Sequence, residues 1–521
     1  MEIDILTGPA DPETPGGPGG YGGPGSPGEP GEPDGAGDSA GAEGASGSGE
    51  LAARQSHRFR VFDSTSAPAD ERLLRRLGEG TDGAGLAAPA VVLPDFCHKA
   101  KSEMPSSIAV ATRDAIRPAL TDAALNCGMA LVTLDVERPS PAAVTAFYRQ
   151  VIERFPSPPG WRPELSRAEV LRAATEGAAF AADRYGLGDA ELDRIEERGA
   201  LEIEEYGGAR RAARELPWLV VQLSRLRFGG IGPSTHFLEL QEVEEILDPV
   251  VAGQLGLHAG QVTLQFHNGG GVLTGQLGGL YGKRKSASKL LRAEMSVQKP
   301  LSHLLTARSL AQAKRRFAAY FTAGCPSVPA CGDDGRRALL ATRLAMNYGF
   351  AYRMATYAAL RAMARSAFGA ATTLVVDSPH NSIYEEDVAG GRAFVHRHNA
   401  CRAYPAAMMA GHPAFAQTGQ PLLLPGTNRT SSYLCVPSAG AGRSLYTACH
   451  GTGSIISAFE RSGRSRLDPQ GRTTARYRYD GTAPAEVPHL DDRGVNEALS
   501  ILTGHDLVRP VARMRPFAVL T

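Results

Sequence analysis

A sharp change in composition near residue 55 confines the fold to the rest of the chain. Residues 1–55 are mainly Gly, Pro, Ser, Ala and acidic side chains, with almost nothing apolar after Leu6. Such a segment cannot bury enough apolar surface to offset the entropy that ordering costs, so we expect a disordered tail. Residues 56–521 show no clean module boundary and no internal repeat. They predict one large α+β domain.

Within residues 56–521, the spacing of apolar residues predicts both helices and strands. Spacings of three and four predict helices over 163–186, 189–207 and 339–369, the last being the longest such pattern. Ser166 and Glu169 fit a capping box. Short apolar runs that end at polar, Gly or Pro residues predict strands, and the run at 91–96 is expected to stop at its proline. The runs lie at 58–64, 91–96, 237–247, 260–271, 372–387, 420–427 and 431–438.

The net charge of zero hides an uneven distribution. The first fifty residues contain ten acidic and no basic side chains, which leaves 55 basic against 45 acidic side chains in the remainder. A basic body attracts polyanions such as nucleic acid, although a solvated surface explains the charge equally well. We interpret the acidic tail as an autoinhibitory competitor for the basic body.

Other sequence features bear on the compartment. No run of about 18 uncharged apolar residues occurs, and the first residues lack the basic and apolar regions of a secretory signal. The seven cysteines are odd in number and form no paired CxxC module. We therefore expect no membrane partner and a reduced, cytoplasmic protein, in which a special cysteine is a ligand or nucleophile.

Five side chains at strand ends or small-residue turns are candidates for chemistry. Cys127, His236, His267 and His380 lie in LNCGM, STHFLEL, LQFHNGGG and VVDSPHN, and His450 in TACHGTG precedes glycines that let a phosphate approach the backbone. Each histidine alone is more often a hydrogen-bonded structural residue. Together, one thiolate and three imidazoles predict a divalent-metal site, for which ligand softness alone favours zinc or iron.

Nine segments along the chain form an ordered set. They are LPDFCHKAKSEMPSSIAVAT, DAALNCGM, GGIGPSTHFLELQ, LQFHNGGG, LAMNYGFAYRMAT, VVDSPHN, VHRHNACRAY, GQPLLLPGTNRTSSY and CHGTGS. In this order they resemble the RtcB family of RNA-splicing ligases over roughly residues 90–521. The resemblance implies an RtcB-like fold and an enzyme that joins RNA 3'-phosphate or 2',3'-cyclic phosphate ends to 5'-hydroxyl ends with GTP and Mn2+. It further implies a role in RNA repair or tRNA processing, and an archease-like activator.

The resemblance also implies roles for single residues. The manganese ligands of the family fall on Cys127, His236, His267 and His380, and its guanylylated histidine falls on His450. A neutral imidazole is a suitable nucleophile toward a phosphate whose charge a metal neutralises. The GTP contacts fall on Thr235, His236, Phe237, Leu238, Glu239, His380, Asn381, Pro425, Gly426, Thr427, Asn428, Ser432, Gly451, Thr452 and Gly453.

The chain departs from the family pattern at several positions. Ala124 stands where the family has an acidic ligand, and Asp122 could replace that ligand only if the loop is rebuilt. His398 replaces a lysine, and an arginine after His267 and a C-terminal lysine are absent. His396 and His398 are expected on one side of a strand, where a plain surface position is favoured over an RNA contact. The basic run 282–289 is either a solvated loop or a substitute phosphate contact.

Three functions remain open at this point. An active ligase is favoured because the nucleophile and four ligands persist together, and a degenerate metal- or nucleotide-binding regulator is the alternative. A hydrolase that uses Cys127 is disfavoured because no signature places a base beside that thiol. A covalent nucleotide adduct at His450 distinguishes the ligase from both.

Overall fold

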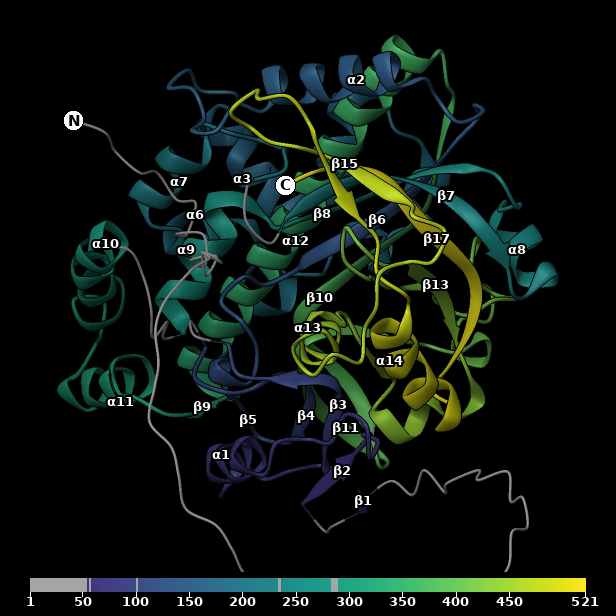
Figure 1. The fold of residues 1–521 in the computed structure, drawn as a ribbon. Helices are drawn as coiled ribbons and strands as arrows, with labels where there is room; N and C mark the ends of the chain where they lie inside the picture. Colours follow the sequence, from purple (N-terminus) through teal and green to yellow (C-terminus); the bar gives the residue numbers. More distant parts are fainter. Residues whose placement is uncertain (1–53, 56–57, 100–101, 233–235, 283–288) are drawn as a thin grey trace, which may run out of the picture.

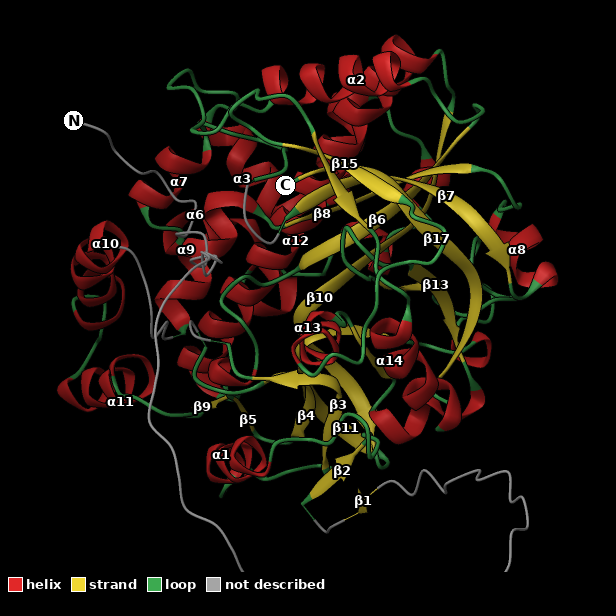
Figure 2. Cartoon of the chain, viewed as in Figure 1, coloured by secondary structure: helices red, strands yellow, loops and turns green. Residues whose placement is uncertain are grey.

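The computed structural model describes residues 54–55, 58–99, 102–232, 236–282 and 289–521. The predicted disorder of residues 1–53 therefore falls outside the described residues. β1 (Arg54–Gln55) pairs with β2 (Phe59–Val61), so the first strand begins before residue 56. Helices surround one extended sheet (Figure 2), and this mixed architecture confirms the predicted α+β class.

A single sheet organises the molecule. Its strands follow the order β1-β2-β3-β4-β11-β10-β6-β8-β7-β17-β13-β12, with β14 on β11, and β15 pairing with both β16 and β17. Most neighbours are antiparallel, and β5 and β9 form a separate pair. The remaining bounds are β3 Ala90–Cys97, β4 Ser106–Thr112, β5 Ala115–Ile116, β6 Cys127–Leu134, β7 Phe237–Ile246, β8 Val262–Asn268, β9 Val328–Pro329, β10 Thr372–Val388, β11 Gly391–Arg402, β12 Leu422–Leu424, β13 Ser432–Pro437, β14 Thr447–Cys449, β15 Thr473–Tyr477, β16 Ala485–Pro488 and β17 Val508–Leu520.

The longest helix, α12 (Gly332–Phe368), confirms the predicted helix over 339–369. It packs against α2, α3, α4 and α9 and also contacts β6 and β10. The other helices are α1 Glu71–Thr81, α2 Pro141–Arg154, α3 Arg167–Glu176, α4 Ala178–Tyr185, α5 Asp189–Leu192, α6 Gly208–Glu215, α7 Trp218–Ser224, α8 Pro249–Leu255, α9 Gly271–Tyr281, α10 Lys289–Lys299, α11 Leu310–Phe321, α13 Gly453–Arg461 and α14 Arg493–Gly504, with short turns η1 Pro118–Leu120, η2 Glu196–Gly199, η3 Glu204–Tyr206, η4 Pro300–Leu304, η5 Ala406–Met408 and η6 Ala439–Ser444.

Three local predictions can be compared with the structure, and one of them is confirmed. The capping box of Ser166 and Glu169 is present at the start of α3. The helix predicted over 189–207 is wrong, because only α5 and two short turns form there while Ile195 bridges to β10. The predicted stop at the proline of 91–96 is also wrong. β3 continues to Cys97, and Asp95 adopts a φ of 67°.

A buried ion pair fixes α12 to the sheet. Arg353 Nε and Nη2 donate to the two carboxylate oxygens of Asp377 at 2.6 and 2.9 Å, and both side chains are fully buried. Arg353 Nη1 also donates to the carbonyl oxygen of Asn126. Helix, strand β10 and the turn that precedes Cys127 are thereby held by one guanidinium.

Among the described residues, no helix combines the length and the apolar composition that a membrane span requires.

Two glycines of α9 provide a matched test of its packing. A Cβ atom at Gly278 would lie 1.8 Å from the carbonyl oxygen of Ala123, whereas a Cβ atom at Gly275 would meet nothing within 4 Å. We expect Gly278→Ala to lower the free energy of unfolding by about 1–3 kcal/mol through overpacking. Gly275→Ala should raise it by about 0.5–1 kcal/mol through helix propensity. Urea denaturation measures both, and equal stability of the two variants would contradict the close approach of α9.

Candidate metal and nucleotide site

Four neighbouring strands deliver the predicted ligands to one end of the sheet. Cys127 begins β6 and pairs directly with His380 on β10. On the other side of β6, β8 places His267 opposite Met129. β7 begins opposite His267, and His236 is the residue before its first position. Segments that are distant in sequence thus meet through antiparallel register.

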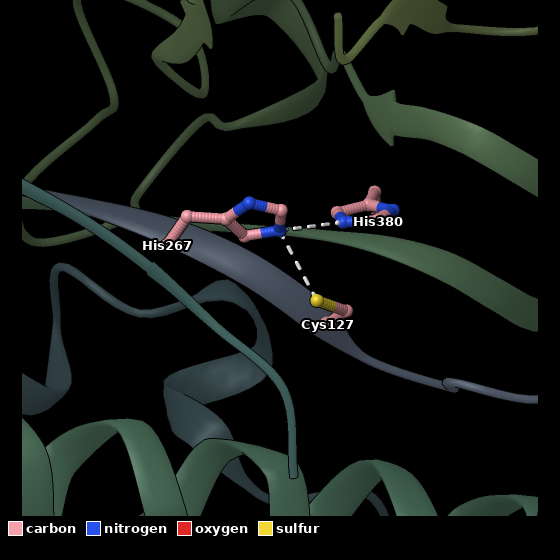
Figure 3. A group of neighbouring side chains, drawn as sticks. All are labelled: Cys127, His267 and His380. Atoms are coloured by element: carbon pink, nitrogen blue, oxygen red, sulfur yellow. Dashed lines mark hydrogen bonds between the residues drawn. The ribbon is translucent and has the colours of Figure 1, made fainter. Parts of the chain in front are cut away.

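Three of the predicted ligand atoms converge on one another (Figure 3). Cys127 Sγ lies 3.1 Å from His267 Nε2, and His267 Nε2 lies 3.2 Å from His380 Nε2. His236 Nε2 lies 3.5 Å from Cys127 Sγ. The ligand atoms of Cys127, His267 and His380 all lie within 4.8 Å of one another. This group of one thiol and two imidazoles fits a divalent transition metal, and His236 lies beside it through its contact with Cys127.

Burial sets the protonation of these ligands. It lowers the pKa of His236 to about 4 and that of His380 to about 3, so both imidazoles are neutral near pH 7 and offer a lone pair. Burial raises the pKa of the Cys127 thiol to about 12, an effect that the charge of Arg353 opposes. A metal ion that binds here must therefore displace the thiol proton.

Cys127, His236, His267 and His380 are here named the ligand group. His450 lies directly beside it. Its ring stacks on that of His380 with centroids 3.6 Å apart, and its centroid is 5.0 Å from that of the His267 ring. Burial holds the pKa of His450 well below its usual range, with smaller contributions from His380 and His267. Its Nδ1 atom is buried and has no hydrogen-bond partner among the described residues. A neutral, unpartnered imidazole nitrogen next to a metal site is suited to nucleophilic chemistry.

Hydrogen bonds connect the two predicted nucleotide loops. Thr452 Oγ1, in the loop after His450, donates to the carbonyl oxygen of Pro425 at 2.6 Å. The next residue, Gly426, donates its N–H to Ser432 Oγ at 3.0 Å. The loop that precedes α13 and the turn between β12 and β13 are therefore joined, and together they form one wall of the candidate nucleotide site.

Gln241 extends this wall to β7. Its Nε2 atom donates to Glu239 Oε2 at 2.9 Å and to Ser432 Oγ at 3.5 Å. Burial raises the pKa of Glu239 to about 7. The Phe237 ring lies 5.7 Å from the His267 ring, whereas the Leu238 side chain is fully buried in the core.

The other predicted nucleotide contacts differ in their position and exposure. Asn381 organises the turns of the site, since its Oδ1 accepts from Asn399 N at 2.7 Å and its Nδ2 donates to the carbonyl oxygen of Ala124 at 3.2 Å. Thr235 lies outside the described residues. Thr427, Asn428 and Gly451 are half-buried, and Gly453 is exposed at the start of α13.

Asp95 is a residue of this region that sequence reasoning missed. Its Oδ1 atom accepts from Ser454 N at 2.6 Å and also from Ser454 Oγ, and a Cβ atom at Gly451 would lie 3.1 Å from its Oδ2. Asp95 therefore fixes the start of α13 just after His450. Its sequence signals were a Pro-Asp pair inside an apolar run and its place in the segment LPDFCHKAKSEMPSSIAVAT.

Asp122 and His398 are among the positions at which departures from the family pattern are expected. Asp122 Oδ1 accepts from Ala124 N at 2.8 Å and its Oδ2 accepts from Ser102 Oγ at 2.9 Å, so this carboxylate braces the turn. Its Oδ2 also lies 3.7 Å from His398 Nε2. The surface position favoured for His396 and His398 is wrong: both are buried, because β11 lies between β4 and β10. Of the basic run 282–289, residues 283–288 lie outside the described residues.

Comparison with known proteins shows where this chain has relatives. A family model described as "tRNA-splicing ligase RtcB" matches residues 82–521. The tRNA-splicing ligase RtcB of Pyrococcus horikoshii is 27% identical over 415 residues, which cover 76% of this chain and 44% of that protein. The tRNA-splicing ligase RtcB of Thermococcus kodakarensis is 27% identical, and the match covers 76% of this chain and 79% of that protein. The RNA-splicing ligase RtcB of Mycobacterium tuberculosis is 28% identical, and the match covers 64% of this chain and 78% of that protein. The chain thus spans less than half the length of the Pyrococcus relatives it matches.

The raised pKa of Cys127 makes metal uptake depend on pH. We expect binding of Mn2+ to release about one proton, because the Cys127 thiol must ionise while His236 and His380 are already neutral. The affinity for Mn2+ should therefore rise about tenfold per pH unit between about pH 6 and pH 8. Titration calorimetry in buffers of different ionisation enthalpy measures the released proton. Cys127→Ser should abolish the release, and the exposed Cys331→Ser should preserve it. Uptake that is independent of pH would contradict a thiolate ligand.

Proposed function

Because the chain belongs to the RtcB family, we propose that it is an RNA ligase that joins 3'-phosphate or 2',3'-cyclic phosphate ends to 5'-hydroxyl ends. GTP and Mn2+ are its cofactors in this proposal. The observation that carries it is the stacking of the neutral, buried His450 on His380 at the edge of the thiol and imidazole group. In this proposal His450 is the nucleophile, and its ring lies directly against that of His380, which would be a metal ligand.

The metal would be held by Cys127, His236, His267 and His380. When bound, the ion supplies positive charge that neutralises phosphate oxygens during transfer. The four side chains orient it through strands of one rigid sheet, which keeps the ligand atoms in fixed relation to His450. Nitrogen and sulfur donors suit a transition metal better than Mg2+ or Ca2+.

His450 would carry the nucleotide between two transfers. A ring nitrogen forms a bond to the α-phosphorus of GTP as the bond to pyrophosphate breaks. A 2',3'-cyclic phosphate end is first opened by water to a 3'-phosphate. The guanylyl group then passes to the RNA 3'-phosphate, which frees His450. Attack of the 5'-hydroxyl on the activated phosphorus forms the phosphodiester, and GMP and the hydroxyl proton leave. The depressed pKa of His450 supports the first transfer, because a neutral imidazole is the nucleophilic form.

The loops around His450 would hold the nucleotide. Gly451, Thr452 and Gly453 lead into the N-terminus of α13, where backbone N–H groups favour anions. Thr452 is tied to Pro425, so the loop and the opposite turn present one surface. The buried Glu239 on β7 is the acidic member of the predicted nucleotide contacts.

Covalent labelling tests the first transfer. Protein incubated with GTP labelled at the α-phosphate and Mn2+ should retain label after denaturation, and omission of Mn2+ should reduce the label by about 100-fold or more. His450→Ala should abolish it because the nucleophile is gone. His258→Ala, at an exposed histidine in the loop between α8 and β8, should label like the parent.

Ligation provides the second readout. Labelled protein should join a 3'-phosphate RNA to a 5'-hydroxyl RNA, and His450→Ala should not. Metal binding without label and without joined product would overturn the proposal in favour of a binding protein.

A further inference from the structure

Residues 283–321 hold most of the excess positive charge of the body. The segment contains ten basic side chains and one acidic side chain, Glu294, whereas residues 51–521 as a whole contain 55 basic and 45 acidic side chains. Its described part comprises α10, η4 and α11 (residues 289–321), which we name the helical arm. Figure 1 shows α10 and α11 at the edge of the molecule, beyond α9.

The inner side of the helical arm uses some of these charges for structure. Lys299 Nζ donates to the carbonyl oxygen of Tyr320 at 3.0 Å, which ties α10 to α11. Arg316 Nε donates to Asp334 Oδ1 at 2.7 Å and its Nη1 donates to the carbonyl oxygen of His303 at 3.2 Å. The His303 ring stacks on that of Tyr320 with centroids 4.1 Å apart. The contacts of Lys299 and His303 hold the arm together, and the ion pair of Arg316 with Asp334 fixes it to α12.

The outer side presents cations to solvent. Arg292, Arg308, Lys314 and Arg315 are exposed. Among the described residues, only Arg315 of these four has a carboxylate within 4.0 Å. Its Nη2 atom lies 3.9 Å from Asp334 Oδ2. An exposed pair at this distance contributes little. The four cations therefore remain available to an anionic ligand.

Exposed rings and apolar side chains accompany these cations. The Phe317 side chain is 52% exposed, and its ring lies parallel to that of Phe321 with centroids 5.2 Å apart. Leu305 and Leu310 are 75% and 74% exposed. Aromatic faces beside cations are the combination that binds single-stranded nucleic acid, since bases stack while cations contact phosphates.

The helical arm is connected to the ligand group by one helix. α9 begins at Gly271, four residues after His267, and its 11 residues span about 16 Å. At its end, the Tyr281 ring packs against His303 with centroids 5.1 Å apart. A polymer whose end lies beside His267 can thus continue toward the arm.

We propose that the helical arm binds the phosphodiester backbone of single-stranded RNA behind the reacting end. Arg292, Arg308, Lys314 and Arg315 contact phosphates, and Phe317 stacks on a base. This assignment rests on the proposed ligase function and adds the surface that holds the substrate strand.

Charge-neutralising variants of the full chain test the assignment. The arm variant carries Arg292→Gln, Arg308→Gln, Lys314→Gln and Arg315→Gln. The control variant carries Arg72→Gln, Arg75→Gln, Arg149→Gln and Arg162→Gln, which remove the same charge from exposed positions on α1, α2 and the loop after α2. The probe is a short fluorescent RNA with a phosphate at both ends, which cannot be joined. Anisotropy is recorded over a range of salt concentrations.

The arm variant should bind the probe at least about tenfold more weakly than the control variant. Its slope of log K against log salt should shrink by about 2–3, since each phosphate contact in a single strand contributes about 0.7. Phe317→Leu should weaken binding several-fold at unchanged slope, because a base loses its stacking partner. Labelling of His450 should persist in every variant.

Equal RNA affinity of the arm and control variants would overturn the assignment while leaving the ligase proposal intact. Binding of the arm to anionic phosphatidylserine vesicles in place of RNA would overturn it in favour of a membrane surface. Loss of His450 labelling in the parent protein would instead mark failure of the ligase proposal itself.

Discussion

The guanidinium of Arg353 is the interaction on which the arrangement of the site depends. It lies in a fully buried position where an unpaired charge is very costly, and the Asp377 carboxylate compensates it. Because the same group also holds the carbonyl oxygen of Asn126, the turn that starts β6 cannot shift independently of α12. The longest helix, the central strand and the cysteine of the ligand group therefore share one electrostatic anchor.

The sequence predicted those features that depend on neighbours along the chain. The long apolar pattern of α12 and the capping box of Ser166 follow from helical periodicity and cap chemistry. The segment 189–207 shows the limit of such reasoning. Its apolar residues are spaced like a helix, yet Ile195 pairs with β10, and this tertiary pairing outweighs local propensity. The burial of His396 and His398 follows from the place of β11 in the sheet, which periodicity does not encode.

The candidate site was predictable in composition and not in geometry. Residue type and turn context indicated Cys127, His236, His267 and His380, but their meeting point depends on the register of β10, β6, β8 and β7. Asp95 and Asp122 are examples of residues whose structural role the sequence does not indicate. Both carboxylates brace turns beside the site, and their roles emerge only from the backbone N–H groups that face them. The turn that contains Ala124 is held by hydrogen bonds to Asp122 and Asn381.

The wide separation of the predicted ligands along the chain has a consequence for how the candidate site forms. Cys127 is separated by 109 residues from His236 and by 140 from His267, and His267 by a further 113 from His380. Contacts of such high sequence separation form only after long loops have closed, which is slow and entropically costly. No nascent fragment that lacks β10 contains the complete ligand group. A metal ion held by the four side chains would therefore report that β6, β7, β8 and β10 have come together, and it would favour that arrangement by mass action over forms that lack one of these strands.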